Sequence, residues 1–172
     1  RAAVSRAAEI AVDAGLRAAI IAACRKLEIA QPLSRYAVFA LGRLGGSEMG
    51  YASDADILFV HDPFPDADEV DAQRLANEVA SQLARLLKET SPEPSMPVDY
   101  DLRPEGRNGP LARSIASFVE YYERWADAWE YQSLLRARPI TGDSELAQEF
   151  VTLIDPYRYP ARGLPEASLR EI

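Results

Sequence analysis

The most informative segment of the chain is Leu41-Gly42-Arg43-Leu44-Gly45-Gly46-Ser47-Glu48-Met49-Gly50-Tyr51-Ala52-Ser53-Asp54-Ala55-Asp56. The apolar run Tyr36–Leu41 leads into it, and a second run continues from Asp54 to His61. Short apolar runs bounded by Gly, Pro or Asp predict buried strands. The glycines between them predict a tight turn in which the backbone is accessible. The stretch is therefore expected to form a strand, a glycine-rich loop and a second strand that begins with two aspartates.

The two aspartates, Asp54 and Asp56, are separated by one residue. On a strand this spacing points both side chains to the same face, about 6 to 7 Å apart. Two ionised carboxylates held side by side repel each other, so the pair is tolerated mainly when it is protonated, solvated or bound to a cation. Mg²⁺ suits such oxygen ligands and also a triphosphate. An isolated Asp-x-Asp is more commonly a solvated strand end or a helix cap, so the pair alone does not identify a site.

A second acidic pair, Asp99 and Asp101, lies on a strand predicted over Val98–Leu102. A sheet that places this strand beside the first pair would gather three carboxylates in one patch. Such a patch can bind two metal ions, one activating the attacking oxygen and the other stabilising the leaving phosphate. The glycine loop would let backbone N–H groups approach phosphates, and a helix starting near Gly46 would add its positive end. The loop matches neither a Walker loop nor the dinucleotide fingerprint, so the order of the motifs carries the prediction.

Helices are predicted around this core, in an α+β fold with a small mixed β-sheet flanked by helices. Residues 1–30 are expected to be an N-terminal helical segment, 31–112 the catalytic core, and 113–172 a helical subdomain that is the truncated start of a helical bundle. Residues 66–88 show an amphipathic pattern, 103–110 predict a loop, and 111–138 again read as helical. The large aromatic residues from Phe118 to Trp129 are expected to be core. The last residues before Ile172 resemble the start of a further helix.

Composition excludes several classes of protein. The 172 residues are 48% hydrophobic and 27% charged, which is typical of a soluble globular chain. The net charge of -8 argues against nucleic acid as a partner, and no apolar run is long enough for a membrane span. We expect a cytoplasmic protein that contacts neither. The single Cys24 is expected to be a buried or half-buried thiol, and the single His61 a solvated or capping residue, so a catalytic triad is not expected.

These residues resemble the glutamine synthetase adenylyltransferases, enzymes of bacterial nitrogen control within the DNA polymerase beta-like nucleotidyltransferase superfamily. Residues 41–56 are similar to the glycine and metal-ligand signature of that family, and Val98-Asp99 through Leu102-Arg103-Pro104 to its third-carboxylate strand. Gly109-Pro110-Leu111 and residues 129–138 continue the resemblance, which covers about 36–143. It implies a nucleotidyltransferase fold.

The family carries two such domains, one attaching AMP to glutamine synthetase and one removing it by phosphorolysis. Glu48-Met49-Gly50-Tyr51, Gln132 and Leu134-Leu135-Arg136 resemble the attaching, C-terminal half, and residues 101–111 resemble the actinobacterial branch. The resemblance therefore implies transfer of AMP from ATP to a tyrosine hydroxyl of glutamine synthetase. A nitrogen-signalling regulatory protein is implied as a second partner. Two alternatives stay open: the phosphorolytic activity on the same scaffold, and a non-catalytic regulatory binding module.

The resemblance also implies which residues form the site. The catalytic and metal-binding set is Asp54, Asp56 and Asp99, which would hold two Mg²⁺ ions. The set expected to bind ATP is Gly45, Gly46, Ser47, Ser53 and Arg103, with Arg103 nearest the phosphates. Many family members have Arg where this chain has Asp101, so Asp101 is left as a neighbour of the third ligand. Ser47 fits the Gly-Ser phosphate-binding pattern of the wider superfamily.

Overall fold

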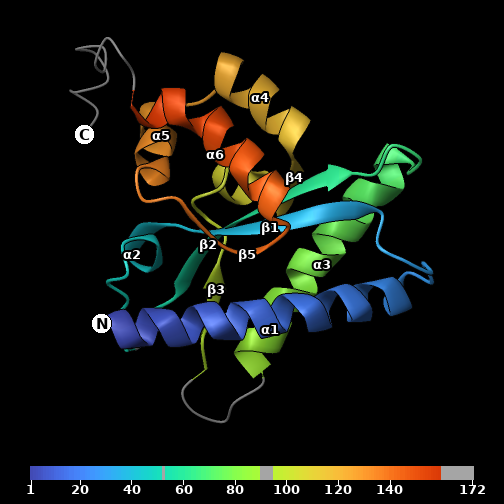
Figure 1. The fold of residues 1–172 in the computed structure, drawn as a ribbon, viewed down its shortest axis with the longest axis horizontal. Helices are drawn as coiled ribbons and strands as arrows, with labels where there is room; N and C mark the ends of the chain where they lie inside the picture. The colour runs from blue at the N-terminus through green and yellow to red at the C-terminus, as the bar shows by residue number, and fades with distance from the viewer. Residues whose placement is uncertain (52, 90–94, 160–172) are drawn as a thin grey trace.

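The structure is a computed structural model that describes residues 1–51, 53–89 and 95–159. Its elements are α1 (Ala2–Lys26), β1 (Ser34–Ala40), α2 (Gly42–Gly45), β2 (Ala55–Pro63), α3 (Glu69–Glu89), β3 (Val98–Asp99), the 3-10 turn η1 (Gly106–Asn108), β4 (Ala112–Ser114), α4 (Ile115–Arg124), α5 (Ala128–Leu134), β5 (Arg138–Gly142) and α6 (Ser144–Arg158). Figure 1 shows the sheet between two layers of helices, with α1 and α3 on one side and α4 to α6 on the other. The predicted α+β fold, with a small mixed sheet flanked by helices and a helical N-terminal segment, is confirmed.

The sheet has the strand order β3-β2-β1-β5, and β4 also pairs with β2. β1 is antiparallel to both β2 and β5, whereas β2 is parallel to β3 and to β4. β3 pairs with the first residues of β2, and β4 pairs with residues 59–61 farther along it. The beginning of β2 therefore lies between β1 and β3.

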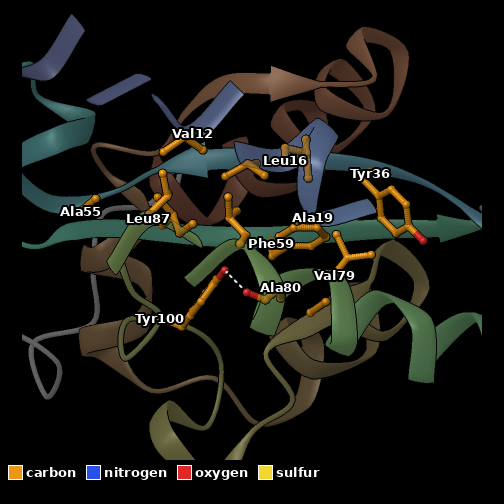
Figure 2. Packing of buried hydrophobic residues seen from close by; sticks show 14 of the residues in the cluster. Val12, Leu16, Ala19, Tyr36, Ala55, Phe59, Val79, Ala80, Leu87 and Tyr100 are labelled. Carbon is orange, nitrogen blue, oxygen red and sulfur yellow. Dashed lines mark hydrogen bonds between the residues drawn. The ribbon is translucent and has the colours of Figure 1, made fainter. Parts of the chain in front are cut away.

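Alternate residues of the central strands pack against the two helical layers, as the period of two requires. Val38 and Phe59 lie in the cluster formed with α1 and α3, part of which Figure 2 shows. Phe39 and Leu58 lie in the other cluster, with residues of α4, α5 and α6. Asp56 shares the parity of Leu58, so its side chain is on the face of the sheet that carries α4 to α6.

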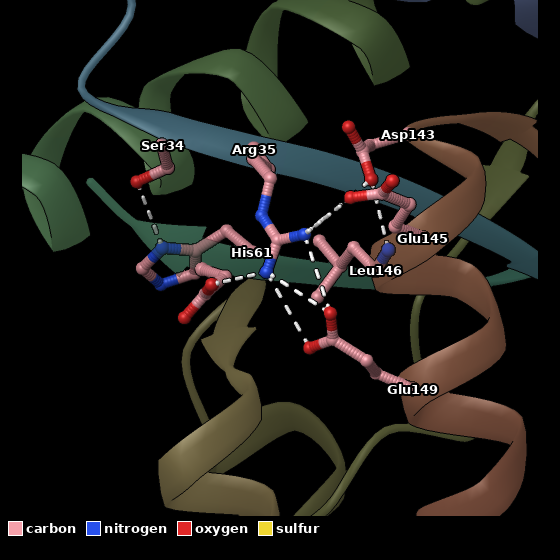
Figure 3. A network of polar contacts seen from close by, with 8 residues as sticks. Ser34, Arg35, His61, Asp143, Glu145, Leu146 and Glu149 are labelled. Carbon is pink, nitrogen blue, oxygen red and sulfur yellow. Dashed lines mark hydrogen bonds and ion pairs between the residues drawn. The ribbon is translucent and has the colours of Figure 1, made fainter. Parts of the chain in front are cut away.

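One arginine ties α6 to the sheet at the end of β1 that is distant from the glycine loop. Arg35 of β1 contacts Asp62 of β2 at 2.6 Å, and it contacts Glu149 and Asp143 beside it at 3.3 and 3.7 Å. Figure 3 shows the Asp143 and Glu149 carboxylates on the α6 side of the guanidinium. These ion pairs join the beginning of α6 to the end of the sheet formed by Arg35 of β1 and Asp62 of β2.

His61 lies in the same region and is 1% exposed, so the expectation of a solvated histidine is wrong. One ring nitrogen lies 3.2 Å from Ser34 Oγ (Figure 3), and the other lies 3.1 Å from Gln73 Oε1. Burial lowers the pKa of the imidazole. The predicted burial of Cys24 is confirmed.

Several elements differ from the sequence-based expectation. β4 and β5 were not predicted, and the strand expected over 98–102 ends at Asp99. The expected helix near Gly46 is absent from the described residues, because the short α2 ends at Gly45. β3, β4 and β5 are each held by pairing with a strand that is distant in sequence.

The aromatic residues of α4 and α5 divide into two groups. Phe118 and Tyr122 are buried, as predicted, but Trp125 is 70% exposed and Trp129 is 42% exposed. The expectation that both tryptophans belong to the core is wrong. The helix expected to begin before Ile172 lies outside the described residues. Across the described ranges, no helix is both long and apolar enough to cross a membrane.

Candidate active site

The parallel pairing of β2 and β3 brings the predicted carboxylates together. Asp56 is the register partner of Asp99, and neighbouring strands lie about 4.8 Å apart. Asp54 is exposed and immediately precedes β2. Burial raises the pKa of the Asp56 carboxyl, and the charges of Asp99 and Asp54 raise it further. The pairing thus places Asp56 beside Asp99, with Asp54 just before the same strand, and the roles of the three carboxylates stay predictions.

Gly42 and Arg43 hold the Asp56 side chain. Gly42 has φ +48°, and a Cβ at this position would overlap the Asp56 carboxylate and lie 3.2 Å from its Cγ. The backbone N–H of Arg43 donates to that carboxylate, which lowers its pKa in opposition to the burial. The backbone N–H of Leu41 donates to the Asp56 carbonyl at 2.9 Å. Only a residue without a side chain fits between β1 and this carboxylate.

The middle of the glycine loop packs against the segment that leads into β5. A Cβ at Gly45 would overlap the Arg136 carbonyl oxygen, and one at Gly46 would lie 3.1 Å from the Arg136 guanidinium. The same guanidinium contacts Glu48 at 2.9 Å. Ser47 has φ +56°, and its Oγ accepts from Arg138 at 3.4 Å. Gly45 is therefore required for chain packing, and phosphate binding by Gly45, Gly46 and Ser47 remains a prediction.

Ser53 accepts a hydrogen bond within the segment that immediately precedes Asp54 and β2. Its Oγ accepts from the backbone N–H of Gly50 at 3.2 Å. The guanidinium of Arg43 lies beside the same segment, because its Nη2 is 3.4 Å from the position of a Cβ at Gly50. Ser53 thus shapes the approach to the carboxylates, and its contact with ATP remains a prediction.

Arg103 is turned into the loop that follows β3. Its side chain is 8% exposed and donates to the carbonyls of Gly109 at 3.1 Å, Tyr100 at 2.9 Å and Arg107 at 3.3 Å. Burial lowers the pKa of the guanidinium. These bonds stabilise the loop that follows Asp99, so the Arg103 guanidinium binds backbone carbonyls of the protein itself. Its contact with the phosphates remains a prediction.

Asp101 supports Asp99 from the same loop. The backbone N–H of Asp101 donates to Asp99 Oδ1 at 2.6 Å, while the Asp101 carboxylate binds Arg107 at 2.7 Å. Asp99 Oδ2 has no hydrogen bond to the described part of the chain. One oxygen of Asp99 is therefore oriented, and the other is available to a ligand.

Glu130 is a further residue of this region that the sequence reasoning did not single out for a role. It is 1% exposed and accepts hydrogen bonds from Glu105 N at 3.1 Å, Asp127 N at 2.7 Å and Tyr121 Oη at 2.8 Å. It therefore joins α4, α5 and the loop after β3. Asp127 followed three residues later by Glu130 is a capping-box pattern, which is the signal that could have revealed it.

The carboxylates of Asp54, Asp56 and Asp99 suit a hard cation, because such cations prefer oxygen ligands and would offset the repulsion between the negative charges. Burial raises the pKa of Asp56, the charges of Asp99 and Asp54 raise it further, and a bound cation would favour the ionised carboxylate. Within the described ranges, no three His, Cys, Asp or Glu side chains are arranged so that they could hold a metal ion together. The two Mg²⁺ ions therefore stay a prediction, which rests on the chemistry of these carboxylates and not on a complete set of ligands.

Comparison with known proteins assigns the family. The family model of glutamate-ammonia ligase adenylyltransferase matches residues 2–152. The chain is 52% identical over 139 residues to the bifunctional glutamine synthetase adenylyltransferase/adenylyl-removing enzyme of Streptomyces avermitilis, covering 81% of this chain and 14% of that protein. The enzymes of the same name from Mycobacterium avium and Nocardia farcinica are 52% identical over 136 residues and 47% identical over 162 residues. These two alignments cover 79% and 94% of this chain, but only 14% and 16% of the relatives. The chain therefore belongs to the glutamate-ammonia ligase adenylyltransferase family and spans about one sixth or less of the length of these relatives.

Proposed function

We propose that this chain transfers AMP from ATP to a tyrosine hydroxyl of glutamine synthetase. The observation that carries the proposal is the pairing of Asp56 with Asp99 across β2 and β3, with Asp54 at the adjoining strand end. Carboxylates brought together at the start of two neighbouring strands suit metal-assisted phosphoryl chemistry. The names of the relatives supply the substrate class, because they describe enzymes that adenylylate glutamine synthetase.

The proposed roles follow from the position of each carboxylate. Asp54, Asp56 and Asp99 would hold Mg²⁺, which when bound would neutralise charge on the phosphates. Gly42 and the Arg43 N–H keep Asp56 in place, and the Asp101 N–H orients Asp99. Asp99 Oδ2 would accept the tyrosine proton as the phenolic oxygen attacks the α-phosphorus.

The carboxylates suit either attachment or removal of AMP, so the choice of attachment rests on other residues. Glu48 and Arg136, both in segments that resemble the attaching half, contact each other at 2.9 Å across the glycine loop. The relatives carry both activities in one name, and this chain covers a small part of them. We assign attachment to this chain and leave phosphorolysis as the second candidate.

The test is transfer of label from α-labelled ATP to purified glutamine synthetase in the presence of Mg²⁺. The chain is compared with an Asp54→Asn, Asp56→Asn double variant, which removes two charges while keeping the shape of the side chains. A parallel reaction supplies inorganic phosphate and adenylylated synthetase, and ADP is measured.

Label that appears on the synthetase and is lost in the double variant supports the proposal. Release of ADP without labelling would reassign the chain to the removing activity. If neither product forms, although the chain is folded by circular dichroism, the non-catalytic binding module is the better description.

A further inference from the structure

The region around the carboxylates contains several arginines, and nearly all are engaged by the protein itself. Arg103 donates to three carbonyls, and the remaining pairs are Arg107 with Asp101, Arg113 with Glu105, Arg136 with Glu48, and Arg138 with Glu9. Arg43 is the exception. Its side chain is exposed, and within residues 1–51, 53–89 and 95–159 its guanidinium has no hydrogen bond or ion pair.

Arg43 nevertheless lies at the centre of the candidate site. Its backbone N–H donates to the Asp56 carboxylate. Its guanidinium carbon lies 3.8 Å from the position of a Cβ at Gly50, beside the turn that Ser53 closes before Asp54. The side chain therefore extends from Asp56 along the glycine loop, and its donors remain available to a bound anion.

From this geometry we propose that Arg43 binds the β- and γ-phosphates of ATP and stabilises the pyrophosphate as it leaves. The inference rests on the proposed transfer of AMP and adds a residue that the sequence reasoning did not assign. A guanidinium suits the role because its N–H groups bind phosphate oxygens in pairs and because it stays charged. A chain of net charge -8 also needs a local cation to attract a triphosphate.

The strand order decides which phosphates Arg43 would contact. β3 with Asp99 lies on one side of β2, and β1 leads into α2 with Arg43 on the other side. In-line displacement requires the attacking and leaving oxygens on opposite sides of the phosphorus. The tyrosine oxygen forms a bond to the α-phosphorus on the Asp99 side, and its proton passes to Asp99. The bond from the α-phosphorus to the bridging oxygen breaks on the Arg43 side, and the electron pair leaves with pyrophosphate.

The experiment measures binding of Mg²⁺-pyrophosphate, Mg²⁺-ATP and AMP by calorimetry to the wild-type chain and to Arg43→Gln, Arg43→Lys and Arg17→Gln. Arg17 is a suitable control because it is an exposed arginine of α1. Losing a charged hydrogen-bond donor costs affinity by about 10- to 100-fold. Arg43→Gln should weaken pyrophosphate and ATP by that factor and leave AMP unchanged, Arg43→Lys should recover part of the loss, and Arg17→Gln should bind like the wild type.

Unchanged pyrophosphate affinity in Arg43→Gln, or no pyrophosphate binding by the wild type, would overturn the inference. An equal loss for AMP would also overturn it, because AMP lacks the leaving phosphates. Arg103→Gln separates the two arginines, since it should lower the melting temperature by loosening the loop after β3. If Arg43-dependent pyrophosphate binding is found but no label reaches glutamine synthetase, Arg43 keeps its role and the proposed acceptor fails.

Discussion

Gly42→Ala is the sharpest test of how the chain holds Asp56. An alanine at φ +48° adopts a left-handed conformation that costs about 1 to 2 kcal/mol relative to glycine. Part of this cost is offset, because Gly→Ala reduces the entropy of the unfolded chain by about 0.4 to 1 kcal/mol. The new Cβ also overlaps the Asp56 carboxylate, which must move away from the Arg43 N–H. Losing that hydrogen bond adds about 1 to 3 kcal/mol.

Gly106→Ala is a matched control. Gly106 has φ +52°, but its Cβ would meet only the Asp101 carbonyl oxygen at 3.7 Å, an ordinary contact. It therefore carries the backbone strain without the collision. For a chain of this size each kcal/mol lowers the melting temperature by about 2 to 4 °C.

Thermal unfolding of both variants and calorimetric titration with Mg²⁺-ATP measure the difference. Gly42→Ala should be less stable than Gly106→Ala by about 1 to 3 kcal/mol, which is the cost of the lost hydrogen bond. It should also lose Mg²⁺-ATP affinity, whereas Gly106→Ala should retain it. Equal stability losses with unchanged binding in both variants would refute the claim that Gly42 positions Asp56.

Other predictions concern the scaffold. The pKa of His61 is lower in the folded state, so the unfolded state binds more protons as the pH falls. The free energy of unfolding in urea should therefore be highest above about pH 6.5 and should decrease as the pH falls through the folded pKa. His61→Gln removes the only histidine and should abolish this pH dependence. Glu130→Ala leaves buried donors unpaired and should lower the free energy of unfolding by about 1 to 3 kcal/mol per unsatisfied donor, as measured by thermal unfolding. The control Glu120→Ala breaks an exposed pair with Arg124 and should cost at most about 1 kcal/mol. Equal losses in the two variants would contradict the role of Glu130. Tyr100→Phe removes the 2.9 Å bond to the Ala80 carbonyl and should destabilise by about 0.5 to 1.5 kcal/mol, and an unchanged unfolding curve would count against that bond.

Much of the fold could be predicted from sequence because its main elements have strong local patterns. α1 and α3 carry long helical periods, and β1 and β2 are apolar runs bounded by Pro, Gly and Asp. β4 and β5 were missed because they are short and lack alternation. Their strand conformation is stabilised by pairing with β2 and β1, which are distant in sequence.

The carboxylate edge could be predicted only as a set of motifs in order. Asp54 and Asp56 are two residues apart at the start of β2, but the meeting of Asp56 with Asp99 depends on the pairing of β2 with β3. The partners of arginines are even less visible from sequence. Nothing local distinguishes Arg103, which is buried against carbonyls, from Arg43, which is exposed beside the glycine loop.

Asp56 and Asp99 are expected to form one site because β2 and β3 place them side by side. A double-mutant cycle on Mg²⁺-ATP affinity, with Asp56→Asn, Asp99→Asn and both together, tests it most directly. We expect each single variant to lose most of the affinity and the double variant to lose little more, with a coupling energy within about 0.5 to 3 kcal/mol. Additive losses, or a single variant that binds Mg²⁺-ATP like the wild type, would contradict it.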